Sequence, residues 1–234
     1  MDGVRESDKN PGEFRTLQNQ IGRPARFVPP PPNTLAEQLD QFERHLHAER
    51  RFDGLVDGFL AHYQFEAIHP FMDGNGRVGR LLLAIVIEEW CHLSDQWLYM
   101  SSYFDDNKDR YMDLLLRVST DGAWEPWIHF CLTGVIETAK DTQRRCDDLL
   151  SLHREFHDRL RKGAGSVRLA AIVDDLFVNP VAVASRVADR HGVTYPTARA
   201  DLKRLQRAAI VRPLENAPQI AYYCPAILEI TYAD

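Results

Sequence analysis

Residues 69–80 bring together side chains that suit phosphate chemistry. His69 can accept a proton from an attacking hydroxyl near neutral pH, and Asp73 offers the oxygen ligands that Mg²⁺ prefers. Gly74 and Gly76 let backbone N–H groups approach phosphate oxygens without an intervening Cβ atom. The residue types in this stretch therefore predict a site that binds a phosphate-bearing ligand.

The elements on either side of this stretch are predicted to be helices. Apolar residues recur at helical spacing over positions 55–67, and a helix there must end near His69 because a residue before proline avoids the helical region. Residues 77–92 are apolar nearly all round, which is typical of a central helix packed on several sides. Arg77 and Arg80 would lie one turn apart at the start of that helix, whose N-terminus itself attracts anions.

More helical segments are expected around this centre. Thr34 is predicted to cap a helix, with Glu37 three residues later and apolar residues recurring at helical spacing after it. The other segments cover residues 107–118, 124–140 and 141–161. Residues 1–33 are rich in Gly, Pro and charge, so we expect an extended N-terminal arm there.

A flexible segment at residues 163–166 marks the expected boundary between two domains. The C-terminal domain, residues 163–234, is predicted to contain three helices followed by two short strands. They cover residues 167–177, 181–191, 194–209, 210–214 and 220–223. Such a helix, glycine turn and second helix followed by a hairpin is the arrangement of a winged helix-turn-helix.

The composition argues against several classes of protein. A formal net charge of −6 does not suit a generally basic nucleic-acid-binding protein or a polybasic membrane anchor. The longest apolar stretch, residues 81–87, is much too short to span a membrane. The cysteines lie far apart without C-x-x-C spacing, so we expect no disulfides, no zinc knuckle and a cytoplasmic location. We also expect no metal-like clustering of His62, His92, His129, His153 and His157.

The chain resembles the Fic family. Residues 69–80 match its signature, H-x-F-x-[DE]-G-N-G-R-x-x-R, at every specified position. Residues 11–15, 21–22 and 27–32 resemble the segments that precede the core in larger bacterial Fic proteins, which often end in a winged helix. The resemblance implies a mainly α fold with an N-terminal arm and β-hairpin flap, a Fic helical core and a C-terminal winged helix. These parts would cover residues 1–33, 34–162 and 163–234.

The resemblance implies protein adenylyltransferase activity, in which AMP is transferred from ATP to a protein side-chain hydroxyl and pyrophosphate is released. The target would be a Tyr, Thr or Ser hydroxyl on another protein or on the chain itself. Carried over position by position, His69 would be the catalytic base and Asp73 would bind Mg²⁺. Phe71 would fix the loop against the core.

The nucleotide-binding residues follow from the same resemblance. They would be Gly74, Asn75, Gly76, Arg77, Arg80, Tyr111 and Met112. Asn75 would hold the α-phosphate together with the backbone of the glycines, and Arg77 and Arg80 would neutralise the β and γ phosphates. Tyr111 and Met112 fall where the family often has two tyrosines beside the adenine, and the second tyrosine is missing here.

Two features of the family concern target binding and control. Residues 21–32 would include the flap, an edge strand that holds a target peptide by β-augmentation. Many relatives carry an inhibitory helix with the pattern [S/T]-x-x-x-E-[G/N], whose glutamate pairs with the second motif arginine. No segment before the motif matches this pattern, so we expect no inhibition in cis through Arg80.

The predicted third helix of the C-terminal domain offers a second interaction site. Residues 194–209 carry four basic side chains and one acidic side chain, enough for a few phosphate contacts. Contacts are expected from Thr197, Arg199, Lys203 and Arg204. We favour DNA as the partner, and a docked protein or a homodimer is the alternative.

Two alternative functions fit the sequence. Some Fic relatives transfer UMP or phosphocholine, and others phosphorylate their targets. The phosphorylating branch has a lysine in place of the second glycine, so Gly76 argues against it. The other alternative is a DNA-binding regulator in which the Fic core only senses a nucleotide.

Overall fold

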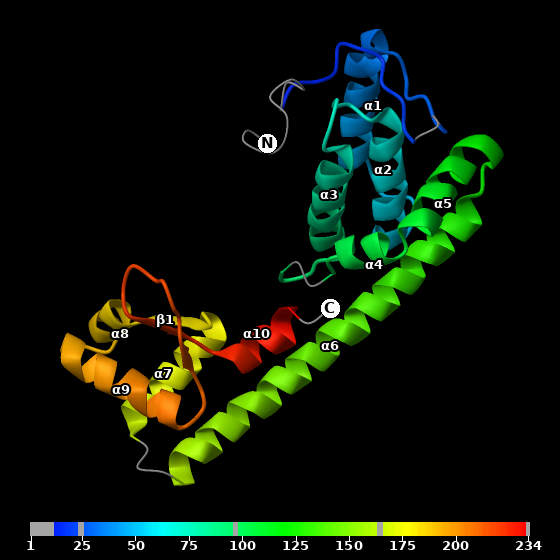
Figure 1. The fold of residues 1–234 in the computed structure, drawn as a ribbon. Coiled ribbons are helices and arrows are strands. Elements are labelled where there is room, and N and C mark those ends of the chain that lie inside the picture. Colours follow the sequence, from blue (N-terminus) through cyan, green and yellow to red (C-terminus); the bar gives the residue numbers. More distant parts are fainter. Residues whose placement is uncertain (1–11, 23–25, 96–97, 163–165, 233–234) are drawn as a thin grey trace. The chain divides into compact units, whose positions relative to one another are not determined.

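The computed structural model is mainly helical (Figure 1). It describes residues 12–22, 26–95, 98–162 and 166–232. The chain divides into two compact units, Met1–Lys140 and Asp141–Asp234. Within the described ranges, no helix combines the length and the apolarity that crossing a membrane requires.

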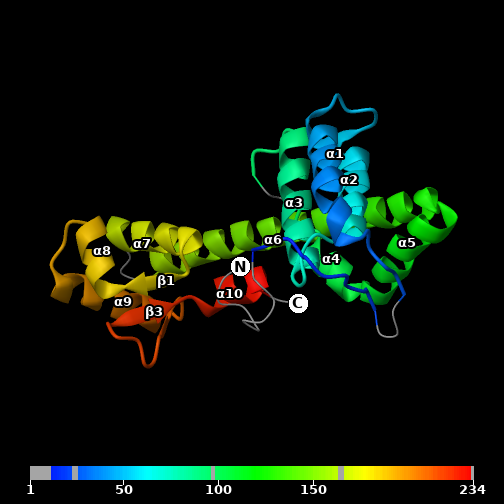
Figure 2. The same cartoon turned by 90° about the horizontal axis from the view of Figure 1, so that it is seen from above.

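The N-terminal unit contains the helices that flank residues 69–80. In chain order they are the 3-10 helix η2 (Pro32–Thr34), α1 (Leu35–His47), α2 (Gly54–Ile68), α3 (Asn75–Trp90), α4 (Ser101–Asp106), α5 (Lys108–Asp121) and the start of α6 (Trp124–Lys162). Helices α1, α2 and α3 lie side by side in both views (Figures 1 and 2). The predictions of α1, α2, α3 and α5 are therefore confirmed, with ends that differ by a few residues.

The pairing of α2 with α3 forms the centre of this unit. The Asp53 side chain caps α2 by accepting a hydrogen bond from the Leu55 N–H at 3.0 Å. Gly54 lets the end of α3 approach the start of α2 closely, since a Cβ atom there would fall 2.8 Å from the Trp90 carbonyl oxygen. The carbonyl of the fully buried Phe59 accepts a hydrogen bond from the Trp127 indole at 3.2 Å. This bond fixes the start of α6 against α2.

Helix α3 is buried on some sides, as expected, but one of its apolar faces is exposed. Leu83 and Ile87 are buried, but Leu81 and Ile85 are 55% and 48% exposed. These two exposed residues lie one turn apart on the helix. An apolar sequence shows that a helix can be buried, but it does not show which of its faces has a neighbour.

The structure also differs from the sequence-based expectations at three other places. The Thr34 side chain makes no capping bond and instead donates to the Pro31 carbonyl within the turn of η2. Helix α4 is not predicted, because six residues are too few for an apolar period to show. Residues 124–161, predicted as two helices, form the single continuous helix α6, and neither Gly nor Pro interrupts it near position 140.

The C-terminal unit combines the end of α6 with a small antiparallel sheet. After α6 come α7 (Val167–Val178), β1 (Val181–Val183), α8 (Ala184–Arg190), α9 (Tyr195–Arg207), β2 (Arg212–Pro213), β3 (Ala221–Tyr223) and α10 (Pro225–Tyr232). The strand order is β1-β3-β2, and Tyr223 lies opposite both Val181 and Arg212. The prediction of a helix from position 181 is wrong for its first three residues, which pair with β3. Helix α10 is not predicted either.

The core of this unit draws on the end of α6. Phe156 and Leu160 are buried together with Leu169 of α7 and Leu202 of α9. The compact unit therefore begins at Asp141, within a continuous helix, rather than at the boundary expected at residues 163–166. Residues 163–165 of that expected linker lie outside the described residues.

Candidate functional site

His69 lies where α2 ends and the motif loop, residues 69–74, begins. Its backbone is in the left-handed region, with φ 51° and ψ 60°, and its N–H still donates to the Phe65 carbonyl at 3.0 Å. This conformation costs a residue with a side chain about 1 kcal/mol or more. The surrounding structure must therefore hold His69 in place.

Arg15 of the N-terminal arm provides much of that support. Its Nε donates to the His69 carbonyl at 2.9 Å, and its Nη2 donates to the carbonyls of Ile68 and Pro30. Its backbone N–H donates to the Pro70 carbonyl at 2.9 Å. The Arg15 side chain is only 3% exposed. Its only signal in the sequence is its place in the family-like segment at residues 11–15, and no role was predicted for it.

Asn75 shapes the motif loop from the other side. Its Oδ1 accepts a hydrogen bond from the Phe71 N–H and its Nδ2 donates to the Phe71 carbonyl, both at 2.8 Å. Phe71 in turn forms an antiparallel bridge with Phe14, and their ring centroids are 5.5 Å apart. Both polar groups of the buried Asn75 amide are thus used by the loop. The side chain therefore positions the loop.

The start of α3 closes the motif loop. Gly74 takes the left-handed conformation at the N-cap, with φ 84°, and its N–H donates to the Asp73 carboxylate at 2.7 Å. The first N–H groups of a helix have no intrahelical acceptor, so the N-terminus of α3 offers backbone donors and a partial positive charge to an anion.

The two motif arginines differ in their surroundings. Arg77 is half exposed, and its Nη2 lies 4.0 Å from an Asp73 carboxylate oxygen. Arg80 is 22% exposed, and its Nη2 lies 3.9 Å from Asp105 of α4. Both contacts are long for ion pairs, so neither guanidinium is firmly held by its acidic neighbour.

A pocket of about 220 Å³ opens between the motif and α5. Its lining includes His69, Gly76 and Arg80 of the motif together with Tyr111 and Met112, the residues predicted to contact adenine. One wall is therefore charged and another is apolar. A pocket of this kind suits a ligand with a phosphate at one end and an aromatic ring at the other.

Four other predicted site residues of the motif are not among the residues that line this pocket. They are Asp73, Gly74, Asn75 and Arg77. The structure therefore brings the predicted catalytic base, one arginine and the predicted adenine contacts into one cavity. It places the predicted metal ligand beside that cavity, on the motif loop.

The arm also contributes to the pocket through Ile21 and Phe27. These residues form an isolated antiparallel bridge, with the Ile21 N–H donating to the Phe27 carbonyl at 2.9 Å. The β-hairpin expected for the flap is thus reduced to a single bridge among the described residues, and residues 23–25 lie outside them. Arg26 next to the bridge forms an ion pair with Asp113 of α5 at 3.2 Å.

Glu66 is a pocket residue that the sequence analysis does not single out. Its Oε1 is buried without a hydrogen-bond partner among the described residues. Burial raises the pKa of Glu66 to about 7, although the positive charge of Arg80 acts in the opposite direction. Gly79 makes room for this carboxyl group, since a Cβ atom there would fall 2.3 Å from Oε1. A polar residue in the apolar pattern of α2 is the one signal that could have marked it.

The predicted adenine contact Tyr111 is held by a buried histidine. The His62 Nδ1 lies 3.1 Å from the Gly79 carbonyl and its Nε2 lies 2.9 Å from the Tyr111 hydroxyl. Because a carbonyl can only accept, Nδ1 carries the proton and the Tyr111 hydroxyl donates to Nε2. Burial lowers the pKa of His62 to about 4, so the ring stays neutral. This network orients Tyr111 and couples α2, α3 and α5.

The pKa and the tautomer of the His69 side chain both suit a proton acceptor. Burial lowers its pKa, and the charge of Arg15 lowers it further, against the opposite effect of a hydrogen bond with the Glu66 carbonyl. That bond involves Nδ1 at 3.3 Å. Nδ1 must be its donor, so the lone pair of the neutral ring lies on Nε2.

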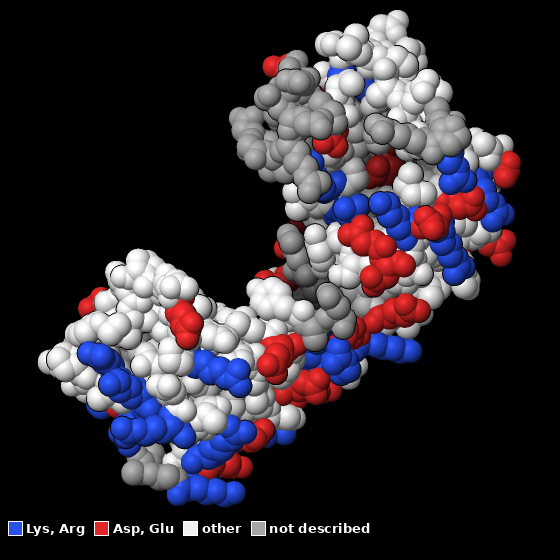
Figure 3. Space-filling view, in the orientation of Figure 1, with Lys and Arg blue, Asp and Glu red and all other residues white. Residues whose placement is uncertain are grey.

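The residues predicted to contact DNA or a partner lie on α9. Arg199 and Lys203 are exposed, whereas Arg204 is partly buried and its Nη1 lies 3.6 Å from the buried carboxylate of Asp201. The Thr197 hydroxyl shares a hydrogen bond of 2.9 Å with the hydroxyl of the preceding N-cap threonine. Figure 3 shows Lys and Arg side chains gathered over this part of the C-terminal unit.

Several known proteins are similar in sequence to the part of the chain that contains the motif. The sequence profile of the Fic/DOC family matches residues 1–87. The chain is similar to the protein adenylyltransferase Fic of Culex quinquefasciatus, with 32% identity over 123 residues, 51% of this chain and 22% of that protein. It is also similar to the protein adenylyltransferase Fic of Drosophila melanogaster, with 43% identity over 74 residues, 31% of this chain and 14% of that protein. The chain spans about a fifth or less of the length of these relatives.

A solved structure resembles nearly the whole chain. A Fic family protein from Desulfovibrio desulfuricans G20 aligns with a TM-score of 0.54 at 20% identity, covering 96% of this chain and 65% of that one. At this identity the likeness shows the fold alone. The residues matched by the family profile include Arg15, Glu66 and the whole motif, whereas Tyr111 and Met112 lie beyond them.

Proposed function

We propose that the chain is a Fic family protein that transfers AMP from ATP to a side-chain hydroxyl of a protein and releases pyrophosphate. The observation that carries this proposal is a neutral histidine, His69, that lines the same pocket as Arg80 and Tyr111 and lies next to the N-terminus of α3. The names of the curated relatives support the same activity.

In the proposed reaction, His69 Nε2 takes the proton of the target hydroxyl. The hydroxyl oxygen then attacks the α-phosphorus of ATP, a bond forms between them, and the bond from that phosphorus to the oxygen of the β-phosphate breaks. Pyrophosphate leaves with the bonding electrons. Such transfers are catalysed mainly by positioning and charge neutralisation, and a general base contributes about 10²- to 10⁴-fold.

The N-terminus of α3 and the arginines would meet the phosphates. Backbone N–H groups around Gly74 and Gly76 would hold the α-phosphate, and Arg77 and Arg80 would neutralise the phosphates that leave. The Asn75 side chain would fix the loop, and the second N–H of its amide would be the group that meets the α-phosphate. Tyr111, held by His62, would pack against the adenine with Met112 beside it.

The residues also fit the magnesium ion that the family implies. Asp73 presents a half-exposed carboxylate on the motif loop, and Mg²⁺ is usually bound by one or two carboxylates together with phosphate oxygens and water. When bound, the ion would neutralise charge on the phosphates. The Asp73 carboxylate already accepts the Gly74 N–H, which orients it for this role.

The experiment that tests the proposal uses ATP labelled at the α-phosphate, Mg²⁺ and a bacterial lysate. We expect labelled protein with the wild-type chain and at least a 100-fold slower reaction with His69→Ala, while ATP binding is retained. His129→Ala, at an exposed position on α6, is the matched control and should be fully active. Equal labelling by the His69 variant would exclude the role of His69.

Mass spectrometry of the labelled target identifies the transferred group. The mass of AMP is expected on a Tyr, Thr or Ser residue of a target protein or of the chain itself. A different added mass, such as that of UMP or phosphocholine, would show that the donor substrate is not ATP. The roles of the motif loop would stay the same. The free cysteines support the further proposal of a cytoplasmic setting.

For the C-terminal unit we propose a winged helix that binds DNA. Its order α7, β1, α8, α9, β2, β3 and the exposed basic residues of α9 support this assignment. A gel-shift experiment with random duplex DNA tests it, and binding that disappears at moderate salt is expected. Absence of DNA binding at low salt would favour the alternative, a docking or dimerisation module.

A further inference from the structure

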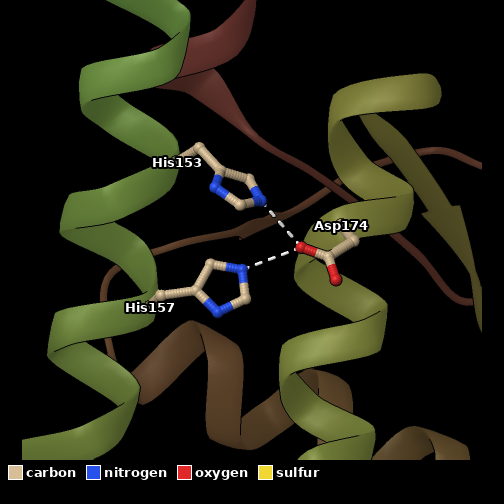
Figure 4. A group of neighbouring side chains, drawn as sticks. All are labelled: His153, His157 and Asp174. Carbon is tan, nitrogen blue, oxygen red and sulfur yellow. Dashed lines mark hydrogen bonds and ion pairs between the residues drawn. The ribbon is translucent and has the colours of Figure 1, made fainter.

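Two histidines and an aspartate come together in the C-terminal unit, outside the proposed transferase site. His153 and His157 lie one turn apart on α6, and Asp174 faces them from α7 (Figure 4). The expectation that the histidines show no metal-like clustering is wrong for this pair. The i, i+4 spacing was visible in the sequence, but the carboxylate comes from the next helix.

The three side chains converge on one point. The Nε2 atoms of His153 and His157 each lie 2.8 Å from the same oxygen, Oδ1 of Asp174. The three potential ligand atoms all lie within 4.8 Å of one another. Both rings bond to the same carboxylate oxygen. The two Nε2 atoms and that oxygen therefore face a shared centre (Figure 4).

The rings are held in this orientation by their neighbours. Phe177 of α7 packs edge-on against His153, with centroids 5.0 Å apart, and the two histidine rings lie 4.4 Å apart. The Asp174 carboxylate is in turn held by the hydrogen bonds from both histidine rings.

The cluster is open to solvent. The side chains of His153, His157 and Asp174 are 39%, 25% and 54% exposed. His153 and His157 also line a surface groove together with Arg154 and Arg161, and Arg161 is paired with Asp158. An ion can therefore reach the three ligands, and solvent can supply further ones.

We infer that His153, His157 and Asp174 bind a divalent transition-metal ion, with Zn²⁺ as the favoured ion and water completing the coordination. Two imidazoles and one carboxylate suit Zn²⁺, Co²⁺, Ni²⁺ or Cu²⁺, whereas Mg²⁺ and Ca²⁺ prefer oxygen ligands alone. Bonds of about 2.0–2.1 Å in a tetrahedral site place ligand atoms about 3.3 Å apart, so the distance from each histidine nitrogen to the Asp174 oxygen needs to grow by only about 0.5 Å.

Binding at this site has a structural consequence within the C-terminal unit. The ion would tie the end of α6 to α7, two helices that already share the buried residues Phe156 and Leu169. A ligand that binds the folded state and not the unfolded chain raises the melting temperature in proportion to the logarithm of its concentration. Metal should therefore stabilise the chain without any nucleotide.

The test uses the full, tag-free chain after treatment with EDTA and its removal. Zn²⁺ binding is measured by competition with a chelating dye, and Co²⁺ binding by its visible absorption spectrum. One equivalent is expected, and the Tm should rise on addition of Zn²⁺. His153→Ala, His157→Ala and Asp174→Ala should each weaken binding at least tenfold and abolish the rise in Tm.

The matched control is His129→Ala, which removes an exposed histidine from the same helix and should bind as the wild type does. The conservative variants His153→Gln and His157→Gln replace any alanine variant whose circular dichroism shows that it is misfolded. Absence of binding by the wild type would overturn the inference. So would binding that survives in all of the variants, because the ion would then lie elsewhere.

Discussion

In the motif loop, buried side chains from distant parts of the chain hold the residues of the site, whereas α9 presents its candidate contacts from one exposed face. Arg15 and Asn75 each hold the backbone of the loop by several hydrogen bonds. Arg199 and Lys203 project from a helix whose shape does not depend on them. A change in the loop should therefore affect the whole site, while changes on α9 should act separately and add up.

The largest effect is expected from Arg15→Ala. Removing the guanidinium leaves the carbonyls of Ile68 and His69 without their donor, and we expect a loss of about 3 kcal/mol in the free energy of unfolding. Urea denaturation measures this loss, and the label-transfer assay should show little activity, although Arg15 does not line the pocket.

Arg44→Ala is the control for this prediction. Arg44 forms an exposed ion pair with Asp40 on α1, so its removal should change stability by less than about 0.5 kcal/mol. If Arg15→Ala were as stable and as active as this control, the loop would not depend on the arm.

An intermediate effect that depends on pH is expected from Glu66→Gln. The folded-state pKa of Glu66 is about 7, above the ordinary value of 4.5, so the folded chain binds more protons than the unfolded chain between these pH values. Stability of the wild type should therefore fall as pH rises from 4.5 through 7. The glutamine side chain does not titrate, so the free energy of unfolding of this variant should rise by about 3 kcal/mol relative to the wild type between pH 4.5 and pH 8.

Urea denaturation of both proteins at several pH values measures this difference. Glu37→Gln, on the exposed side of α1, is the control and should follow the wild type at every pH. A difference between wild type and Glu66→Gln that does not change with pH would show that the carboxyl group is not buried in solution.

The smallest effect on stability is expected on α9. Arg199→Ala and Lys203→Ala should each change the free energy of unfolding by less than about 0.5 kcal/mol. Each should weaken DNA binding and reduce the slope of log affinity against log salt by about 1, and the double variant should show the sum. Fluorescence anisotropy with a labelled duplex at several salt concentrations measures these slopes. If the double variant lost far more DNA affinity than the two single variants lose together, the residues of α9 would depend on one another as those of the motif loop do.

The sequence predicts the parts of the site that lie close together along the chain. The end of α2 at His69, the start of α3 beside the glycines and the turn between Arg77 and Arg80 all follow from local rules. Arg15 and Glu66 do not, because their roles depend on which distant backbone or cavity they meet. Asn75 differs from both, because its amide binds the backbone of Phe71, only four residues away along the chain.

The fold shows a similar division. Helices with a long apolar period, such as α2 and α5, are predictable from their own residues. Strand β1 is not, since residues 181–183 become a strand only by pairing with β3 about forty residues later. The boundary between the units falls inside α6, where packing changes but composition does not. The metal-like cluster needs Asp174 from another helix, so the two histidines alone could not reveal it.

The left-handed backbone conformation of His69 affects how this protein would respond to directed evolution. Glycine adopts that conformation without steric cost, so His69→Gly would relax the loop while removing the base. A library screened only for heat resistance would tend to enrich such a change, and its most durable members would be inert. Thermostable versions of this protein must therefore be selected for turnover at the same time.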